Sequence, residues 1–270
     1  MTDVTPQTWT LQTTIDGPED APVLVLGHSL GSSHIMWDEL IPTLSQGLRV
    51  IRYDLPGHGG STPPELDHPM TMQDLVSALL RTVDALGVDS FHVAGLSLGG
   101  MVALATAEYV PSRVLSCSSM SATPVILPSQ AWVDKAAKVR AEGTQVLADE
   151  TMERWFSPEF RATEEGAAAV ERIREAFIDC SDEGYAQCCE VISQTDLTGD
   201  LPIITMPTLL VSAENDGGFP WPVAEELSGT LEKNGAHVLV CEVPEARHMS
   251  AVEDPGLVAS ALVMRIRMAD

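Results

Sequence analysis

Three polar residues, far apart in the chain, have the types and the order that nucleophilic catalysis requires: Ser97, Asp216 and His248. A serine hydroxyl is a poor nucleophile at neutral pH, so it needs an adjacent base, and that base needs an acid to orient it. Serine, acid and histidine follow one another in this order where the serine stands on a strand-to-helix elbow. A fold that joins the three could open an ester bond through an acyl-enzyme.

The surroundings of Ser97 match such an elbow. It stands in Gly95-Leu96-Ser97-Leu98-Gly99, between an apolar run over residues 91–94 and an Ala- and Leu-rich run over residues 101–109. The turn is so sharp that side chains two positions either side of the serine would collide with the strand and helix, and glycine removes the collision. Residues 90–107 carry no formal charge, so a membrane-spanning helix is an alternative interpretation. The glycines at their centre instead favour a strand, a turn and a helix.

The base and its acid are expected near the ends of the last two predicted strands. His237 begins a predicted strand, whereas His248 lies beyond its far end. Catalytic groups of a parallel sheet gather at the carboxyl ends of its strands, so we expect His248 to be the base. The same argument places the acid after residues 208–213, where Asp216 is favoured over Glu214 because two glycines follow it.

The negative charge of a tetrahedral intermediate needs preorganised N–H donors. In elbow enzymes the residue after the nucleophile supplies one donor, here the backbone N–H of Leu98. A second is expected from the loop after the strand predicted over residues 23–26, and we assign it to the backbone N–H of Leu30.

Short apolar runs alternate with helical periods along most of the chain. The predicted strands are residues 9–15, 23–26, 49–53, 91–94, 114–120, 208–213 and 237–243. Helices are predicted between and after them, over residues 36–44, 72–86, 101–109, 223–233 and 256–268. This alternation indicates an α/β protein with a parallel sheet and right-handed crossovers.

Residues 124–201 break the alternation, because only helices are predicted there: 130–141, 144–155, 164–180 and 183–194. An all-helical insert between the strands of one sheet indicates a lid, and lids commonly contribute to substrate recognition. We therefore expect a core domain of residues 1–123 and 202–270 and a helical lid, residues 124–201, inserted after the sixth strand.

The amino-acid composition limits the classes of molecule that this protein is expected to bind. The 270 residues include 15 Lys and Arg against 39 Asp and Glu, and a net charge of −24 repels nucleic-acid phosphates and anionic lipid. A small-molecule substrate, without nucleic acid or membrane, is expected. The five cysteines show no metal-ligand spacing, so we expect buried, reduced thiols and no metal. Residues 1–6 lack the features of a secretion signal, which makes the cytoplasm the expected location.

These residues are also those by which the chain resembles the α/β-hydrolase superfamily. Gly27-His28-Ser29-Leu30-Gly31 resembles its oxyanion loop, and residues 54–61 resemble its Asp-x-x-Gly-x-Gly-x-Ser turn. Asp216 and His248 stand where its acid and base fall, and the resemblance covers about residues 9–267. It implies the α/β-hydrolase fold, a mostly parallel central sheet flanked by helices, and a Ser-His-Asp hydrolase without a cofactor.

Within that superfamily the chain is most similar to the 3-oxoadipate enol-lactonases of the β-ketoadipate pathway for aromatic breakdown. Residues 152–161 and 184–189 of the predicted lid carry most of this resemblance, whereas His28 stands where that family has asparagine. The resemblance implies that Ser97 attacks a lactone carbonyl and that His248 protonates the enolate leaving group. Water then clears the acyl-enzyme.

The resemblance also implies an anionic substrate, for which Arg154 and Trp155 of the predicted lid are candidate binding residues. The same triad would serve a broad carboxylesterase acting on neutral esters, or a perhydrolase that passes the acyl group to peroxide. A ligand receptor on the same fold is the non-enzymatic alternative, and an intact Ser97, Asp216 and His248 argues against it. A carboxylate-bearing lactone compared with a neutral aryl ester separates the first two.

Overall fold

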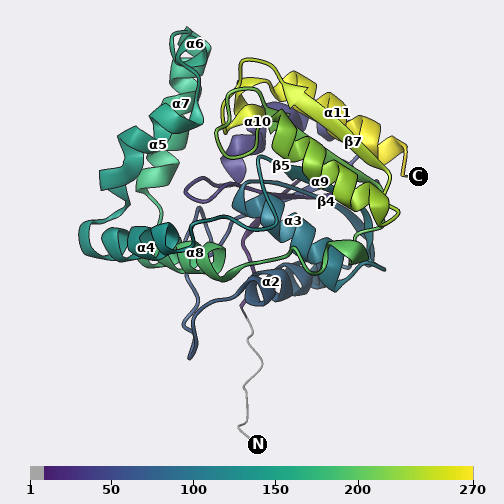
Figure 1. Cartoon of the computed structure of the whole chain (residues 1–270), viewed down its shortest axis with the longest axis horizontal. Helices are drawn as coiled ribbons and strands as arrows, with labels where there is room; N and C mark the ends of the chain where they lie inside the picture. Colours follow the sequence, from purple (N-terminus) through teal and green to yellow (C-terminus); the bar gives the residue numbers. More distant parts are fainter. Residues whose placement is uncertain (1–8, 270) are drawn as a thin grey trace, which may run out of the picture.

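A seven-stranded sheet is the centre of the fold. The computed structural model describes residues 9–269 (Figure 1), so the prediction about residues 1–6 lies outside the described part. The strands run in the order β1-β3-β2-β4-β5-β6-β7, and every neighbouring pair is parallel except β1 with β3. Their bounds are β1 Thr13–Asp16, β2 Val23–Gly27, β3 Arg49–Tyr53, β4 Phe91–Leu96, β5 Val114–Met120, β6 Thr208–Ala213 and β7 Val238–Val243. The predicted α/β class and mostly parallel sheet are confirmed.

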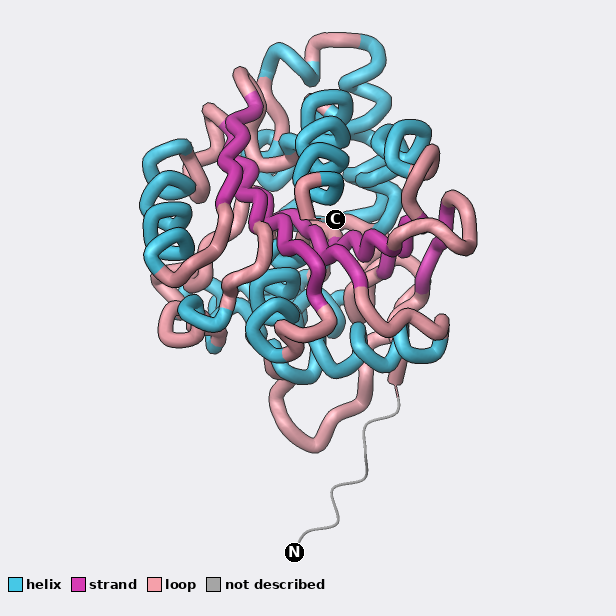
Figure 2. Tube along the Cα trace, turned by 90° about the vertical axis from the view of Figure 1, so that its right-hand side faces the viewer, coloured by secondary structure: helices cyan, strands magenta, loops and turns pink. Residues whose placement is uncertain are grey.

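Helices cover both faces of the twisted sheet (Figure 2). Outside the segment between β5 and β6 they are the 3-10 helix η1 His34–Leu40 and the α-helices α1 Ile41–Leu44, α2 Met72–Ala85, α3 Leu98–Tyr109, α9 Trp221–Lys233, α10 Ser250–Glu253 and α11 Pro255–Arg267. Helix α2 starts at a capping box, in which Thr71 and Asp74 each accept the other's backbone N–H. Gly87, with a φ of 69°, ends it as predicted.

The uncharged stretch around Ser97 forms the centre of the core. Strand β4 is buried along its whole length, and α3 is buried from Leu98 to Glu108. Among the described residues, no helix is both long enough and apolar enough to cross a bilayer. All five cysteines are free thiols and four are buried, but Cys241 is partly exposed because β7 is an edge strand with one neighbour.

The backbones of β2, β4 and α3 approach one another with no room for a side chain between them. A Cβ atom on Gly99 would lie 2.2 Å from the carbonyl oxygen of Gly27, and one on Gly95 would lie 2.2 Å from the carbonyl oxygen of Gly99. A Cβ atom on Gly27 would meet the Tyr53 hydroxyl at 2.2 Å. A Cβ atom on Gly95 or Gly99 would meet backbone atoms far inside van der Waals distance, so both positions require glycine, whereas at Gly27 the buried Tyr53 side chain would have to move.

The segment between β5 and β6 is mainly helical and lies to one side of the core (Figure 1). It contains α4 Gln130–Glu142, η2 Thr144–Leu147, α5 Ala148–Trp155, α6 Pro158–Arg161, α7 Glu164–Ile178, α8 Asp182–Gln194 and η3 Leu201–Ile203. An antiparallel bridge between Val125 and Asp196 joins its two ends. It follows β5, the fifth described strand, and not a sixth as predicted; the strands predicted before residue 124 are themselves only five, and each corresponds to one of β1 to β5.

Two predicted elements near the start of the chain differ from the observed ones. The strand predicted over residues 9–15 begins only at Thr13, because the N–H of Leu11 donates instead to the hydroxyl of Thr82 at 2.9 Å. The single helix predicted over residues 36–44 is η1 followed by α1. Both differences arise where a side chain or a tighter turn takes the backbone hydrogen bonds that regular structure would use.

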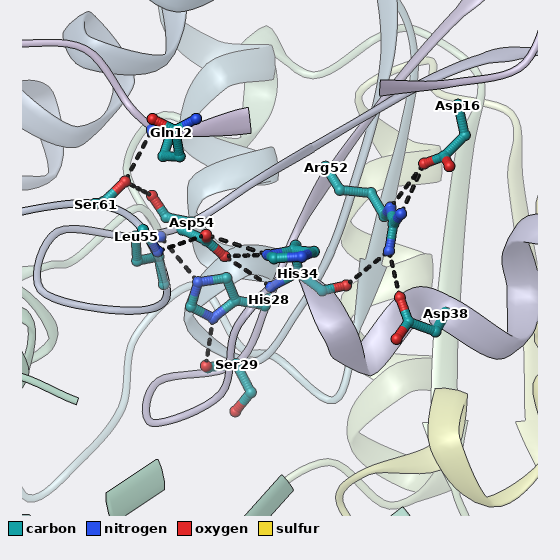
Figure 3. Close-up of polar contacts among 11 residues, drawn as sticks. Gln12, Asp16, His28, Ser29, His34, Asp38, Arg52, Asp54, Leu55 and Ser61 are labelled. Atoms are coloured by element: carbon teal, nitrogen blue, oxygen red, sulfur yellow. Dashed lines mark hydrogen bonds and ion pairs between the residues drawn. The ribbon is translucent and has the colours of Figure 1, made fainter. Parts of the chain in front are cut away.

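Two buried histidines join the loops that follow β2 and β3, and Figure 3 shows the first of them, His28. Nε2 of His28 accepts the N–H of Leu55 at 2.8 Å, and its Nδ1 lies 2.8 Å from a backbone carbonyl. His58 does the same with the N–H of Gly31 at 2.9 Å and a carbonyl at 2.8 Å. Burial lowers the pKa of His28 to about 4 and that of His58 to about 3, so both rings are neutral and donate from Nδ1.

Asp54, the first residue after β3, fixes the turn that these histidines meet. Its Oδ1 accepts the backbone N–H of His34 at 2.8 Å and lies 3.0 Å from that residue's Nδ1, while Oδ2 accepts the N–H of Gly60 at 3.0 Å. Burial alone would raise the pKa of Asp54, but these hydrogen bonds outweigh it and lower the pKa to about 2. Arg52 extends the network to carboxylates at the end of β1 and on η1 (Figure 3).

We expect Asp54→Asn to lower the free energy of unfolding at neutral pH by about 2 kcal/mol, since a carboxyl pKa of about 2 lies below its value of roughly 3.9 in an unfolded chain. That stability is complete above about pH 4 and is lost as the pH falls toward the folded pKa. Urea unfolding at neutral pH and at about pH 3 measures it, with the exposed Asp20→Asn as control. A gap between variant and wild type that is equal at both pH values would contradict the assignment.

Gly99→Ala should destabilise the protein by roughly 3 kcal/mol or more, because the new Cβ would overlap the backbone of β2. Gly229→Ala is the matched control: it lies within α9, where a Cβ would meet nothing within 4 Å, so it should stabilise by up to about 1 kcal/mol. Chemical denaturation of both variants tests this. Equal, small effects would show that the three backbones can move apart.

Candidate active site

Ser97 occupies a strained turn between β4 and α3. Its φ of 58° and ψ of −118° are rare for a residue that has a side chain. Hydrogen bonds on both sides hold this conformation: its N–H donates to Met120 on β5 at 2.8 Å, and its carbonyl accepts the N–H of Met101 at 2.9 Å. The structure thus forms the strand, turn and helix predicted around Ser97.

His248 and Asp216 form a hydrogen-bonded pair beyond the carboxyl ends of β7 and β6. Nδ1 of His248 lies 3.0 Å from Oδ2 of Asp216, whose Oδ1 accepts the N–H of Gly218 at 2.9 Å. Burial alone would raise the pKa of Asp216, but the hydrogen bonds from His248 and Gly218 outweigh it and hold the pKa below its usual value. The ionised carboxylate therefore holds Nδ1–H, and Nε2 is the ring atom that can take a proton.

The two alternatives to this pair occupy other places. His237 stands at the opposite end of β7, where its Nδ1 lies 2.9 Å from a guanidinium nitrogen of α11. Glu214 is exposed, and its carboxylate accepts the N–H of Glu245 at 2.8 Å, which ties together the loops after β6 and β7. The structure brings Asp216, and not Glu214, to His248.

A cavity of about 750 Å³ brings the serine turn, the His–Asp pair and the helical segment together. Ser97, Asp216 and His248 all line it, as do Leu30 from the loop after β2 and Ser121 from the end of β5. The segment between β5 and β6 closes the other side of the cavity with side chains that include Trp132, Lys135, Arg154, Trp155 and Tyr185. The predicted nucleophile, base and acid thus share one concave site of the size that small ligands occupy.

The backbone donors predicted for an oxyanion are available near Ser97. Across residues 9–269, neither the N–H of Leu30 nor that of Leu98 has a hydrogen-bond partner within the protein. Leu30 lines the cavity, and Leu98 is the first residue of α3, whose initial N–H groups have no partners inside the helix. The N–H of Gly99 donates to the carbonyl of His28 at 3.1 Å, which fixes the loop after β2 against the start of α3.

Trp155 forms part of the wall between the cavity and the helical segment. It is 3% exposed, and its ring centroid lies 6.3 Å from that of His248 with 29° between the planes. The same ring packs edge-on against Phe177, with 5.8 Å between centroids. Trp155 is therefore a core residue and a cavity residue at once, and its ring lies beside the imidazole.

Positive charge gathers around the cavity. Arg154 is exposed and lines it, as do Lys135 and Arg247, which the sequence pattern did not single out. Nζ of Lys135 lies 4.1 Å from the ring centroid of Trp132, and burial, together with the positive charge of Arg154, lowers the pKa of Lys135. The three-residue spacing of Trp132 and Lys135 on one helix face was the available sequence signal. Glu159 is the one carboxylate besides Asp216 among the described lining residues.

The next feature is the distribution of side chains that could bind a metal ion. Within residues 9–269, no three or more His, Cys, Asp and Glu side chains are grouped so that they could hold a metal ion. The cavity contributes one histidine and two carboxylates to its wall, and one of those carboxylates is engaged with the histidine. The chemistry available from its side chains is therefore nucleophilic and acid–base.

Comparison with known proteins agrees with this arrangement. Residues 22–154 match the alpha/beta hydrolase fold family. The chain is 31% identical over 246 residues to 3-oxoadipate enol-lactonase 1 of Acinetobacter baylyi, which covers 91% of this chain and 89% of that protein. The crystal structure of the enol-lactonase from Burkholderia xenovorans has a TM-score of 0.88 at 31% identity, covering 95% of this chain and 96% of that one. A thermophilic esterase from Thermogutta terrifontis has a TM-score of 0.87 at 25% identity, covering 96% and 93%.

These similarities extend over nearly the whole of both chains, so they include the helical segment as well as the sheet. The resemblance noted in the sequence is thereby confirmed. The sheet order, the elbow and nearly full-length relatives lead to one conclusion: the chain belongs to the α/β-hydrolase fold family and is an ester or lactone hydrolase.

Proposed function

We propose that this hydrolase opens the ring of a carboxylate-bearing enol-lactone, with 3-oxoadipate enol-lactone as the substrate to test first. The observation that carries the proposal is the cationic lining of the cavity beside Ser97 and the His248–Asp216 pair, in a chain of net charge −24. The long-range field of so acidic a protein repels an anionic substrate, so local cations are needed to hold one. The enol-lactonases of Acinetobacter baylyi and Burkholderia xenovorans among the relatives support the same substrate class.

In the proposed reaction, Nε2 of His248 takes the proton of the Ser97 hydroxyl as Oγ attacks the lactone carbonyl. The N–H groups of Leu30 and Leu98 hold the oxyanion, and ionised Asp216 stabilises the imidazolium. Collapse of the tetrahedral intermediate breaks the ring C–O bond, and the enolate oxygen receives the proton from His248. A water molecule, deprotonated by the same imidazole, then hydrolyses the acyl-enzyme.

The helical segment has the role of a lid in this proposal. The core domain takes residues 1–123 and 202–270, of which the structure describes 9–123 and 202–269, and residues 124–201 close the cavity over the nucleophile. Lys135 and Arg154 bind the substrate carboxylate, since both line the cavity, and the tryptophan stacked on the imidazole supplies an apolar wall. A charged hydrogen bond of this kind contributes about 1.5 to 3 kcal/mol.

A carboxylesterase acting on neutral esters is the second candidate. The apolar part of the cavity wall, formed by Leu30, Ile126 and Trp132, favours it, as does the similarity to an esterase. Both candidates use the same nucleophile and base. They differ in whether the cations of the lid take part in binding.

Ser97→Ala should fold as the wild type does and lose turnover by about 10⁴-fold or more, because no other group replaces the nucleophile. Lactone hydrolysis is followed by loss of ultraviolet absorbance, and thermal unfolding checks the fold. Ser260→Ala, which alters an exposed hydroxyl on α11, is the matched control and should retain full activity. Retention of more than a few per cent of the rate in Ser97→Ala would remove Ser97 from the mechanism.

Lys135→Met and Arg154→Met should each lower kcat/KM for the lactone by about 10-fold or more, since each removes a charged hydrogen bond to the carboxylate. Hydrolysis of p-nitrophenyl acetate, which carries no charge, should change by less than about threefold in both variants. Lys138→Met on the exposed face of α4 is the matched control. Equal losses on both substrates, or a neutral ester that is the better substrate of the wild type, would favour the carboxylesterase.

A further inference from the structure

Hydrogen bonds join the helical segment to the residues just before and just after His248. The N–H of Met249 donates to the carbonyl of Trp155 at 3.1 Å, and Nη1 of Arg247 lies 2.5 Å from the carbonyl of Glu153. The ring of Trp155 also lies beside the imidazole, with 6.3 Å between the centroids. Glu153 and Trp155 at the end of α5 are therefore hydrogen-bonded to the two residues that flank His248, although the two segments are far apart in the sequence.

Glu253 completes this connection from the other side. It is the last residue of α10, and its Oε1 accepts the N–H of Arg247 at 2.7 Å. Its Oε2 accepts the N–H of Ser157 at 3.0 Å and also the Ser157 hydroxyl. One carboxylate thus binds the residue before His248 and the residue that caps α6 in the helical segment.

The carboxylate of Glu253 is placed to hold the loop that carries His248 in position. The loop between β7 and α10 has no regular structure, and Glu245 within it has a φ of 59°, which a residue with a side chain rarely adopts. Hydrogen bonds to an ionised carboxylate are stronger than hydrogen bonds to a neutral acceptor. Glu253 is half-buried, so its hydrogen bonds are screened less than those of an exposed carboxylate. Glu253 does not line the cavity, so it acts on the reaction only through the groups that it holds.

We propose that Glu253 is a positioning residue that sets His248 against Ser97 and couples the placement of that imidazole to the placement of the lid. The proposal rests on the role of His248 as the base. A lid shifted at Ser157 displaces the carboxylate, and the carboxylate displaces the backbone next to His248. In this way the substrate held by the lid and the histidine base that acts on it keep a fixed position relative to each other.

The test compares Glu253→Ala and Glu253→Gln with Glu225→Gln, a matched control on the exposed side of α9. Active sites are counted by a fluorophosphonate titration, and kcat per active site is measured with p-nitrophenyl acetate, which does not need the lid cations. A misplacement of about 1 Å costs up to roughly 100-fold in rate, so Glu253→Ala should lower kcat by about 10- to 100-fold with KM within about threefold. Glu253→Gln, which keeps one acceptor oxygen, should lose less.

A purely structural role would give a different pattern. It would lower the melting temperature and the number of active sites but leave kcat per active site unchanged, and that result overturns the proposal. The downfield proton resonance of Nδ1–H on His248 gives an independent readout: it should broaden or disappear in Glu253→Ala and persist in Glu225→Gln. This signal does not depend on turnover, so it still tests the role of Glu253 if Ser97→Ala shows that the proposed function is wrong.

The link to the lid has its own control. Ser157→Ala removes the hydroxyl contact with Glu253, and the double variant Ser157→Ala with Glu253→Ala closes a mutant cycle. If one contact joins the two residues, the double variant loses little more kcat than Glu253→Ala alone. Losses that multiply would show that Ser157 and Glu253 act independently, which would exclude the coupling between lid and base.

Discussion

The close packing of three backbones is the constraint on which the rest of the structure depends. Glycines at positions 27, 95 and 99 let α3 lie directly against β2 and β4. Because α3 starts so close to the strand end, the chain must turn sharply at Ser97, and its strained φ follows from that turn. The bond from Gly99 to His28 then fixes the loop after β2. The predicted nucleophile and backbone donors are thus placed by one packing contact.

Burial and hydrogen bonding give the histidines of this chain different electrostatic roles. Desolvation keeps His28 and His58 neutral, which lets each accept a backbone N–H and donate to a carbonyl. His34 is half-buried beside Asp54, and the hydrogen bond to that carboxylate raises its pKa. His248 instead meets a buried carboxylate at the edge of a cavity. Residue type alone therefore says little about role, because the surroundings set the charge.

The charge of the protein and the charge of its cavity have opposite signs. The chain carries 39 acidic against 15 basic residues, yet three of those basic residues line the cavity. Two of them, Lys135 and Arg154, come from the helical segment, and Arg247 stands next to His248. The segment that lines one side of the cavity is also the one whose backbone is hydrogen-bonded to the His248 loop. In the proposed function, recognition and acid–base geometry therefore share the same structural elements.

Local features of the sequence determined the parallel sheet, the elbow at Ser97 and the choice of His248 over His237, because apolar runs and glycine positions are properties of neighbouring residues. The preference for Asp216 over Glu214 rested on two following glycines, and the observed bond to His248 decided it. Only the tertiary structure brought Lys135 to the cavity and Glu253 to Ser157, a contact across 96 residues. Such contacts join elements whose relative placement depends on the packing of the whole core, and no local pattern contains that information.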